Sequence, residues 1–157
     1  PIDMINDVYG TEIESMLPYL IQGSLTYIFM HHCGAAGSKY LSDQISASEQ
    51  VIQYGQTKMK ELIEPGLSKE KLVYDIGIGF GKTTEQAQEI IQNIDEIKKA
   101  FDIPLLIGHS RKASALPKVA HIPPQERDEE TAKLSRYFID QGIDYLRVHQ
   151  PNQMSNN

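Results

Sequence analysis

Three short apolar runs in the sequence end at ionisable side chains, and these positions could do chemistry together. The runs are YDIGIGFGK (74–82), PLLIGHSRK (104–112) and IDYLRVH (143–149). Continuous apolar runs of this kind are typical of buried parallel strands, whose carboxyl ends gather at one edge of a sheet. Ligands of parallel α/β proteins bind at that edge. The pattern therefore predicts a polar ligand site where these strands end.

Each of the strand-like runs carries chemically useful side chains at or just after its carboxyl end. In chain order these are Asn6 and Asp7, then Met30, His31 and His32, then Asp75, then Ser110, Arg111 and Lys112, then Arg147 and His149. A carboxylate and an amide together can read the donor–acceptor edge of a heterocycle, because paired hydrogen bonds fix its orientation. Arg147 and His149 lie two residues apart on one strand, so they point the same way and could hold a phosphate or a carboxylate.

Structural readings of the same residues stay open at this point. Asp75 could cap a loop, although a carboxylate that ends a buried strand is costly unless it is used. Arg111 and Lys112 could be solvated charges. His31 and His32 fit hydrogen-bonded loop histidines better than metal ligands, because no zinc-type spacing surrounds them. Asn6 could be a turn residue, and Cys33 has no clear base partner and is interpreted as inert.

The glycine-rich stretch GIGFGKTT resembles a phosphate-binding loop without matching one. The GxxxxGK[ST] pattern requires glycine at position 76, where Ile76 stands, and Lys82 breaks the GxGxxG pattern. The glycines permit unusual backbone angles and close approach, but they do not by themselves make a nucleotide site.

Alternating strand-like and helical patterns predict an α/β fold with a parallel sheet. The strand-like runs cover about 4–8, 25–31, 71–76, 104–109 and 143–148, and the helical patterns cover about 11–22, 45–64, 84–100 and 127–141. The longest loops are expected at 32–44 and 113–126. Such βαβ units admit a small doubly wound sheet or most of a (β/α)8 barrel that lacks its start.

Composition limits the class of protein. The 157 residues suffice for one domain, and the net charge of −6 argues against a general nucleic-acid or anionic-membrane surface. No apolar run is long enough to span a bilayer, and no signal segment opens the sequence. The single cysteine favours a reducing compartment, so a cytoplasmic location is expected.

The motifs resemble those of one known family. INDV (5–8), FMHHCG (29–34), YDIGIGFGKT (74–83), LLIGHSRK (105–112) and YLRVH (145–149) occur in the order expected of dihydropteroate synthase, the pterin-binding TIM-barrel family. The resemblance implies an incomplete (β/α)8 barrel that contains about strands four to eight. It assigns 1–149 to a partial pterin-binding barrel domain and 150–157 to a polar C-terminal tail.

The resemblance also implies an activity, which is the condensation of p-aminobenzoate with 6-hydroxymethyl-7,8-dihydropterin diphosphate in folate biosynthesis. The implied catalytic residues are Asp75, Lys112 and Arg147. The implied binding residues are Asn6, Met30, Asp75 and Lys112 for the pterin, Arg147 and His149 for the diphosphate, and Gly79, Phe80 and Ser110 around p-aminobenzoate. Mg²⁺ is expected for the full family enzyme, with no metal ligand in this chain because its ligand loop is absent.

The departures from the family shape the remaining expectations. Strands one to three and the closing helix are absent, Ile76 replaces a proline, and Ala113 and Gln150 replace polar or charged residues. The chain looks cut at both ends, so a piece of a synthase or a pterin-binding remnant without catalysis is expected. A homodimer or a companion chain would supply the missing strands. The alternatives are a small α/β domain that binds a phosphorylated metabolite and a related pterin-binding methyltransferase, which the SRK motif disfavours.

Overall fold

A parallel sheet with its strands in chain order forms the centre of the molecule. The computed structural model describes residues 2–33 and 40–154. The strands are β1 (Met4–Asp7), β2 (Thr26–Met30), β3 (Leu72–Asp75), β4 (Leu105–Ile107) and β5 (Tyr145–Leu146). Each strand pairs in parallel with the next along the chain. A doubly wound sheet would reverse this order, so the small doubly wound alternative is wrong and the partial-barrel prediction is confirmed.

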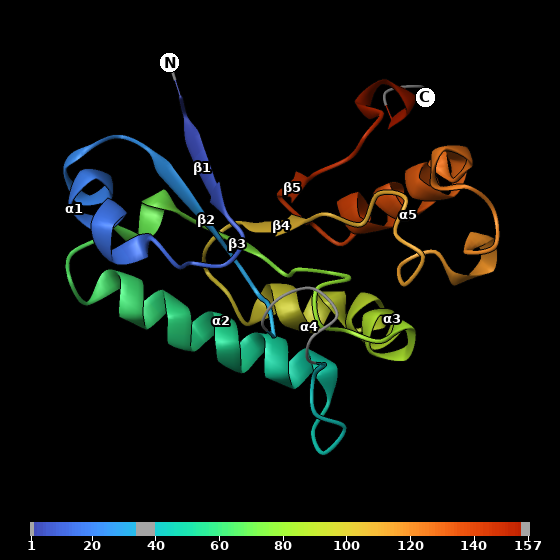
Figure 1. The fold of residues 1–157 in the computed structure, drawn as a ribbon, viewed down its shortest axis with the longest axis horizontal. Helices are drawn as coiled ribbons and strands as arrows, with labels where there is room; N and C mark the ends of the chain where they lie inside the picture. Colours follow the sequence, from blue (N-terminus) through green and yellow to red (C-terminus); the bar gives the residue numbers. More distant parts are fainter. Residues whose placement is uncertain (1, 34–39, 155–157) are drawn as a thin grey trace.

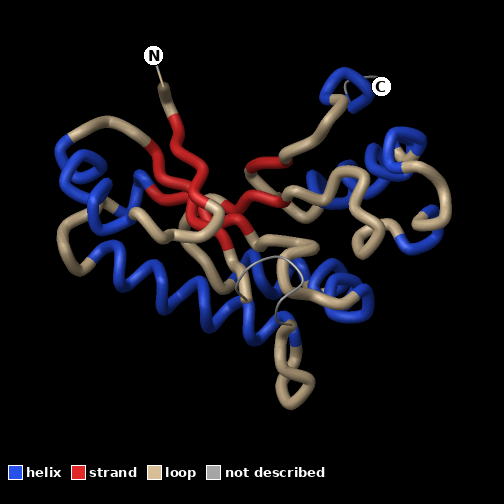
Figure 2. Tube along the Cα trace, viewed as in Figure 1, coloured by secondary structure: helices blue, strands red, loops and turns tan. Residues whose placement is uncertain are grey.

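The helices form an arc around the outer, convex side of the sheet (Figures 1 and 2). They are α1 (Ile13–Gln22), α2 (Ala47–Ile63), α3 (Thr84–Gln92), α4 (Ile94–Lys99) and α5 (Asp128–Asp140). Short 3-10 turns cover Lys69–Lys71, Pro117–Val119, Pro124–Glu126 and Pro151–Met154. Within the described ranges, no helix has the length and apolar character needed to cross a membrane.

The outer face of the sheet packs against the helices through side chains at every second strand position. Tyr74 of β3 is fully buried there, and its ring stacks on Phe29 of β2 at 4.9 Å between centroids. Its hydroxyl donates to the Val51 carbonyl of α2 at 2.8 Å. A Cβ at Gly55 would lie 2.5 Å from the Tyr74 ring, so the glycine allows α2 to approach the sheet closely.

The inner face of the sheet carries the alternate residues. Ile28, Val73 and Leu106 form a small buried cluster of their own on β2, β3 and β4. On the flanking strands, Met4 is 41% exposed and Tyr145 is 39% exposed. The curled sheet therefore has a continuous interior layer in its middle and open edges at β1 and β5, as expected of a barrel that five strands do not close.

The helix predicted over 84–100 is divided in the structure, which corrects that expectation. α3 ends at Gln92 and α4 begins at Ile94, with Asn93 between them at φ −101° and ψ 22°. The Asn93 side-chain amide donates to the Glu89 carbonyl at 3.1 Å. Asparagine competes in this way with the helical backbone, which explains the break. Part of the predicted 32–44 loop, residues 34–39, lies outside the described residues, as do 155–157 of the predicted tail.

We expect Glu89 to stabilise the start of α2 from a neighbouring helix. Its carboxylate accepts from the backbone amides of Ala47 and Ser48 at 2.9 and 3.1 Å. Glu89→Ala should lower the free energy of unfolding by about 1–2 kcal/mol, because it removes a charged cap from a helix N-terminus. Urea denaturation followed by circular dichroism measures this loss. Glu14→Ala, in the exposed first turn of α1, is the control, and an equal effect of both changes would contradict the capping role.

Candidate functional site

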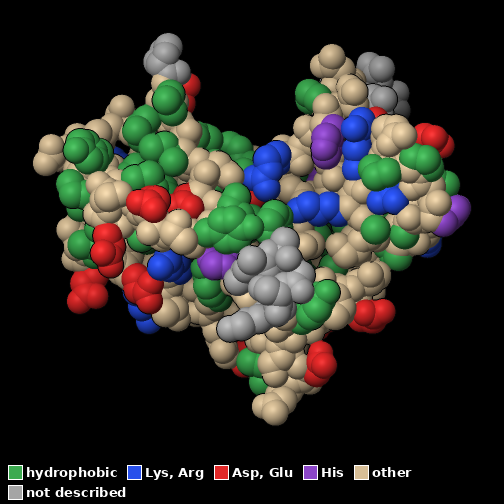
Figure 3. Space-filling model, viewed as in Figure 1, with side chains coloured by type: hydrophobic (Ala, Val, Ile, Leu, Met, Phe, Trp, Pro, Cys, Tyr) green, Lys and Arg blue, Asp and Glu red, His purple; other side chains and the backbone are tan. Residues whose placement is uncertain are grey.

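The predicted site residues gather where the strands end, at the mouth of the curled sheet. A cavity of about 360 Å³ opens there, lined by Phe80, Gly108, Ser110, Lys112, Arg147, Val148 and His149. In the space-filling view, lysine, arginine and histidine side chains collect in the notch between the two arms of the molecule (Figure 3). Asn6, Met30, Asp75 and Gly79 lie outside this lining. Asn6 and Asp75 contact Arg147, which lines the cavity. Gly79 lies next to Lys112, which also lines it.

Asp75 ends β3 with its side chain fully buried. Its Oδ1 accepts from the Gly77 amide at 2.8 Å. Its Oδ2 lies 2.8 Å from Arg147 Nη2 but makes no aligned hydrogen bond within the described part of the chain. Because a buried carboxylate oxygen normally has hydrogen-bond donors, Oδ2 is positioned to accept one from a ligand. Met30 of β2 is the register neighbour of Asp75, so it flanks the same position.

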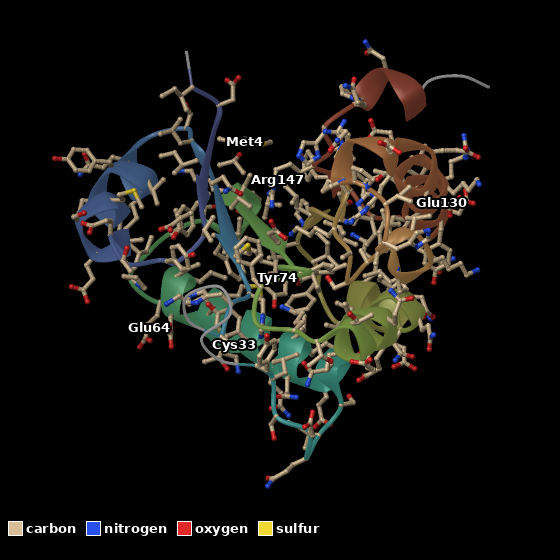
Figure 4. All side chains as sticks on the ribbon, turned by 45° about the vertical axis from the view of Figure 1, so that its right-hand side comes forward. Met4, Cys33, Glu64, Tyr74, Glu130 and Arg147 are labelled. Atoms are coloured by element: carbon tan, nitrogen blue, oxygen red, sulfur yellow. The ribbon has the colours of Figure 1, made fainter. Side chains whose placement is uncertain are left out.

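Arg147 reaches from β5 across the hollow of the sheet. Its backbone amide donates to the Ile107 carbonyl at 3.0 Å, which continues the β4–β5 ladder beyond the assigned strand. Its guanidinium contacts Asp75, and its Nη1 donates to Asn6 Oδ1 of β1 at 3.3 Å. Figure 4 shows Arg147 in the open hollow on the same side as Met4, whereas Tyr74 lies on the helix side. Arg147 therefore joins the first, third and fifth strands.

Gly108 is a site residue that sequence reasoning missed. A Cβ there would lie 2.6 Å from Arg147 Nη2 and 3.1 Å from its Cζ. The glycine after β4 therefore provides the space that the guanidinium occupies. The signal was present in the IGHSRK motif, as a glycine directly after a buried strand.

Lys112 enters the cavity from the loop after β4. Its Nζ donates to the Ile78 carbonyl and lies 4.7 Å from the centroid of the Phe80 ring. A Cβ at Gly79 would lie 3.1 Å from Lys112 Cδ, so the glycine admits the lysine stem. Burial lowers the pKa of Lys112 to about 8, while Asp75 raises it and Arg147 lowers it further. Lys112 and Phe80 therefore lie side by side at the cavity.

Ser110 and His149 form a separate pair at the other side of the cavity. The Ser110 hydroxyl lies 2.8 Å from His149 Nδ1, and the His149 backbone amide donates to the same oxygen at 3.2 Å. These contacts hold the imidazole at the cavity wall. His149 therefore lines the cavity as Arg147 does, but the arginine is directed toward Asp75 instead of toward a shared anion position.

Arg111 supports the site and does not line it. Its guanidinium forms a bidentate ion pair with Asp128, with both nitrogen–oxygen distances at 2.7 Å. Its φ of 61° turns the chain so that Arg111 points away while Lys112 faces the cavity. Arg127 donates to the Arg111 carbonyl and to the carbonyls of Ala120 and Ile122. The solvated-charge interpretation is wrong for Arg111, which is a structural residue of this loop.

Lys82 and His31 form a buried pair beneath the glycine-rich loop. Lys82 is 4% exposed and His31 is 2% exposed, and Lys82 Nζ lies 2.8 Å from His31 Nδ1. The lysine also donates to the carbonyls of Gly77 and Phe80. Because its ammonium is turned into the protein, this loop is not arranged to bind phosphate through Lys82.

The described residues do not offer a metal centre. Across 2–33 and 40–154, no group of three histidine, cysteine, aspartate or glutamate side chains is placed to share a metal ion. Cys33 is half-buried, and burial raises the pKa of its thiol. The Mg²⁺ expectation stays a prediction.

Comparisons with known proteins agree on one family. A family model described as "Pterin binding enzyme" matches residues 2–149. The folate synthesis bifunctional protein of Chlamydia trachomatis is 36% identical over 153 residues, covering 96% of this chain and 34% of that protein. Among solved structures, dihydropteroate synthase from Anaplasma phagocytophilum with bound 6-hydroxymethylpterin-monophosphate is 33% identical with a TM-score of 0.82, covering 94% of this chain and 58% of that one.

A second solved structure supports the same relationship. Dihydropteroate synthase from Clostridium difficile in the presence of pteroic acid is 29% identical with a TM-score of 0.83, covering 97% of this chain and 56% of that one. The chain therefore spans about a third of the bifunctional relative and a little over half of the two synthases.

We expect the charges around Lys112 to shift its pKa in opposite directions. Asp75→Asn should lower the pKa of Lys112 below about 8, because the carboxylate raises it, and Arg147→Met should raise it, because the guanidinium lowers it. Nuclear magnetic resonance of ¹³C-dimethylated lysines measures both shifts, with the exposed Lys99 as the internal control. Shifts of the same sign in the two variants would contradict this electrostatic arrangement.

Proposed function

The chain belongs to the pterin-binding enzyme family, as its motifs indicated, and we propose that it forms the pterin-binding part of a dihydropteroate synthase of folate synthesis. In this reaction the aniline nitrogen of p-aminobenzoate forms a C–N bond to the pterin methylene carbon. The C–O bond to diphosphate breaks, and one amine proton is released. The observation that carries the proposal is the buried Asp75 carboxylate, whose Oδ2 lies 2.8 Å from the Arg147 guanidinium without an aligned hydrogen bond.

The pterin is proposed to bind against the inner face of β1 to β4. Asp75 Oδ2 would accept from the guanidine-like edge of the ring, a neutral donor pair that suits a carboxylate. Asn6 and Lys112 would meet the remaining polar ring atoms, and Met30 would pack against the ring. Because Arg147 contacts both Asp75 and Asn6 in this structure, ring binding requires its guanidinium to move.

The diphosphate is proposed to leave toward Arg147 and His149. A guanidinium binds phosphate oxygens in a bidentate manner, and Arg147 is 44% exposed, so it can turn from Asp75 toward the leaving group. Placed there, its charge stabilises the departing diphosphate while the C–O bond breaks. Lys112 adds positive charge at the same cavity. These three side chains therefore carry the electrostatic part of the proposed catalysis, with Asp75 orienting the pterin.

The p-aminobenzoate is proposed to lie at Gly79, Phe80 and Ser110. Phe80 and Ser110 both line the cavity, and the exposed Gly79 lies beside the Lys112 stem. An aromatic ring, a hydroxyl and exposed backbone suit a small aromatic acid.

The reaction is proposed to need a closed barrel. The open β1 and β5 edges would pair with further strands, supplied by the rest of a longer chain, a second copy or a companion chain. A cytoplasmic location belongs to the same proposal.

We expect the chain to bind 6-hydroxymethylpterin monophosphate. Isothermal titration calorimetry measures this binding, and Asp75→Asn should weaken it at least about tenfold, because it replaces a charged acceptor by a neutral amide. Asp95→Asn, on the surface of α4, is the matched control. Unchanged affinity in Asp75→Asn, with the fold verified by circular dichroism, would place the pterin elsewhere.

We expect the isolated 157-residue chain not to form dihydropteroate from the two substrates. Five strands leave one side of the proposed pocket unbuilt, so the reacting atoms are not enclosed. Chromatographic detection of dihydropteroate tests this, with a complete synthase as the positive control. Product formation by the isolated chain would overturn the expectation, and formation only after addition of the complementary strands would distinguish a synthase from a binding remnant.

A further inference from the structure

The loop between β3 and α3 presents Phe80 to the cavity. Its three glycines give its backbone little intrinsic preference for a single conformation. Gly77, Gly79 and Gly81 adopt positive φ values of 67°, 86° and 66°. Glycines at such angles lose more conformational freedom on folding than other residues. Backbone hydrogen bonds from the Phe80 amide to Gly77 and from the Leu41 amide to Gly81 give only part of the constraint. Something else must hold the turn in one arrangement.

Lys82 supplies that constraint from inside the protein. Its Nζ contacts the Gly77 carbonyl at 2.9 Å, the Phe80 carbonyl at 3.1 Å and His31 Nδ1 at 2.8 Å. An ammonium has three donors, and these three acceptors match them. Two of the acceptors belong to the turn itself, and the third belongs to the end of β2. The lysine therefore ties both halves of the turn to the sheet.

The other side of this attachment is rigid. The His31 amide donates to the Asp75 carbonyl at 2.9 Å, and a Cβ at Gly77 would lie 2.1 Å from the His31 carbonyl oxygen. The His31 ring packs edge-on against Tyr54 at 4.7 Å between centroids. His31 is therefore held against β3 and Tyr54, and Lys82 connects the turn to this position.

The cost of this arrangement indicates that it serves more than packing. Lys82 is almost fully buried, and in the described part of the chain it forms no ion pair with a carboxylate. A buried ammonium without an opposite charge is costly, and here three hydrogen-bond acceptors offset that cost. One of its acceptors, the Phe80 carbonyl, belongs to the residue whose ring lies under Lys112.

Building on the proposed function, we propose that Lys82 is a positioning residue for the aminobenzoate side of the site. It does not line the cavity. It fixes the turn that presents the Phe80 ring to the cavity, because it holds the carbonyls of Gly77 and Phe80. Loss of this hold leaves the pterin contacts of Asp75 in place but misplaces the surface that the aminobenzoate ring meets.

Lys82→Met tests the assignment, with Lys99→Met on the surface of α4 as the matched control. The two probes are 6-hydroxymethylpterin monophosphate, which lacks the aminobenzoate part, and pteroic acid, which contains it. In Lys82→Met the dissociation constant for pteroic acid should rise about tenfold or more relative to that for the monophosphate, because misplacement of a binding surface by a fraction of an ångström is costly. Equal loss for both ligands, or no loss, would overturn the assignment.

The pH dependence gives a readout that a purely structural lysine would not show. Burial lowers the pKa of Lys82 to about 7, with Cys33 and Asp75 raising it and Lys112 lowering it, and burial lowers that of His31 to about 3. As the pH rises from 6 to 8, Lys82 loses its third donor while His31 stays neutral. In the native chain, the preference for pteroic acid over the monophosphate should fall as the pH rises over this range. This change should be absent in Lys82→Met. The change caused by titration of Lys112 should occur in both proteins.

Two further measurements decide the remaining outcomes. If Lys82→Met does not fold, His31→Phe keeps the ring but removes one acceptor, and an unchanged ligand preference there overturns the assignment. If the native chain binds neither ligand, the proposed function fails. Hydrogen exchange of the 76–82 amides then still tests the hold on the turn, and exchange in Lys82→Met that is no faster than in the native chain rejects it.

Discussion

The carboxylate of Asp75 is buried at the end of the central strand, and the rest of the site is arranged around that charge. A buried carboxylate must have donors or an opposite charge close by. The Gly77 amide comes from the following turn, and Arg147 comes from the last strand. Because Arg147 also reaches Asn6 on the first strand, satisfying this one charge links the two open edges of the sheet across its hollow.

The outer face of the sheet packs in the core of the fold, and the inner face carries the candidate site. Alternate residues of the strands face the helices, where Tyr74 and its aromatic neighbours form the main core. The other residues face the hollow, where a small apolar layer gives way to Asp75 and Arg147 at the strand ends. Two lysines whose pKa values burial lowers follow the same division: the partly buried Lys112 faces the cavity, and the buried Lys82 contacts the turn behind it.

Much of the fold could be predicted from local pattern. All five strands and the parallel arrangement are confirmed, because continuous apolar runs between amphipathic segments have few other solutions. The break at Asn93 could not be predicted from the sequence, because it depends on a hydrogen bond from the Asn93 side-chain amide to the Glu89 carbonyl. The choice between a doubly wound sheet and a barrel also lay beyond pattern, because strand order is a property of the assembled sheet.

The sequence by itself determined the family, the strand ends that carry the site and the residue types found there, because these are written in contiguous motifs. Only the tertiary structure decided which of these residues meet. Arg111 and Lys112 are adjacent in the chain, yet a left-handed φ sends one to Asp128 and the other into the cavity. Lys82, Gly108 and His31 acquire their roles through contacts between separate strands and loops, whose geometry no single segment of the chain contains.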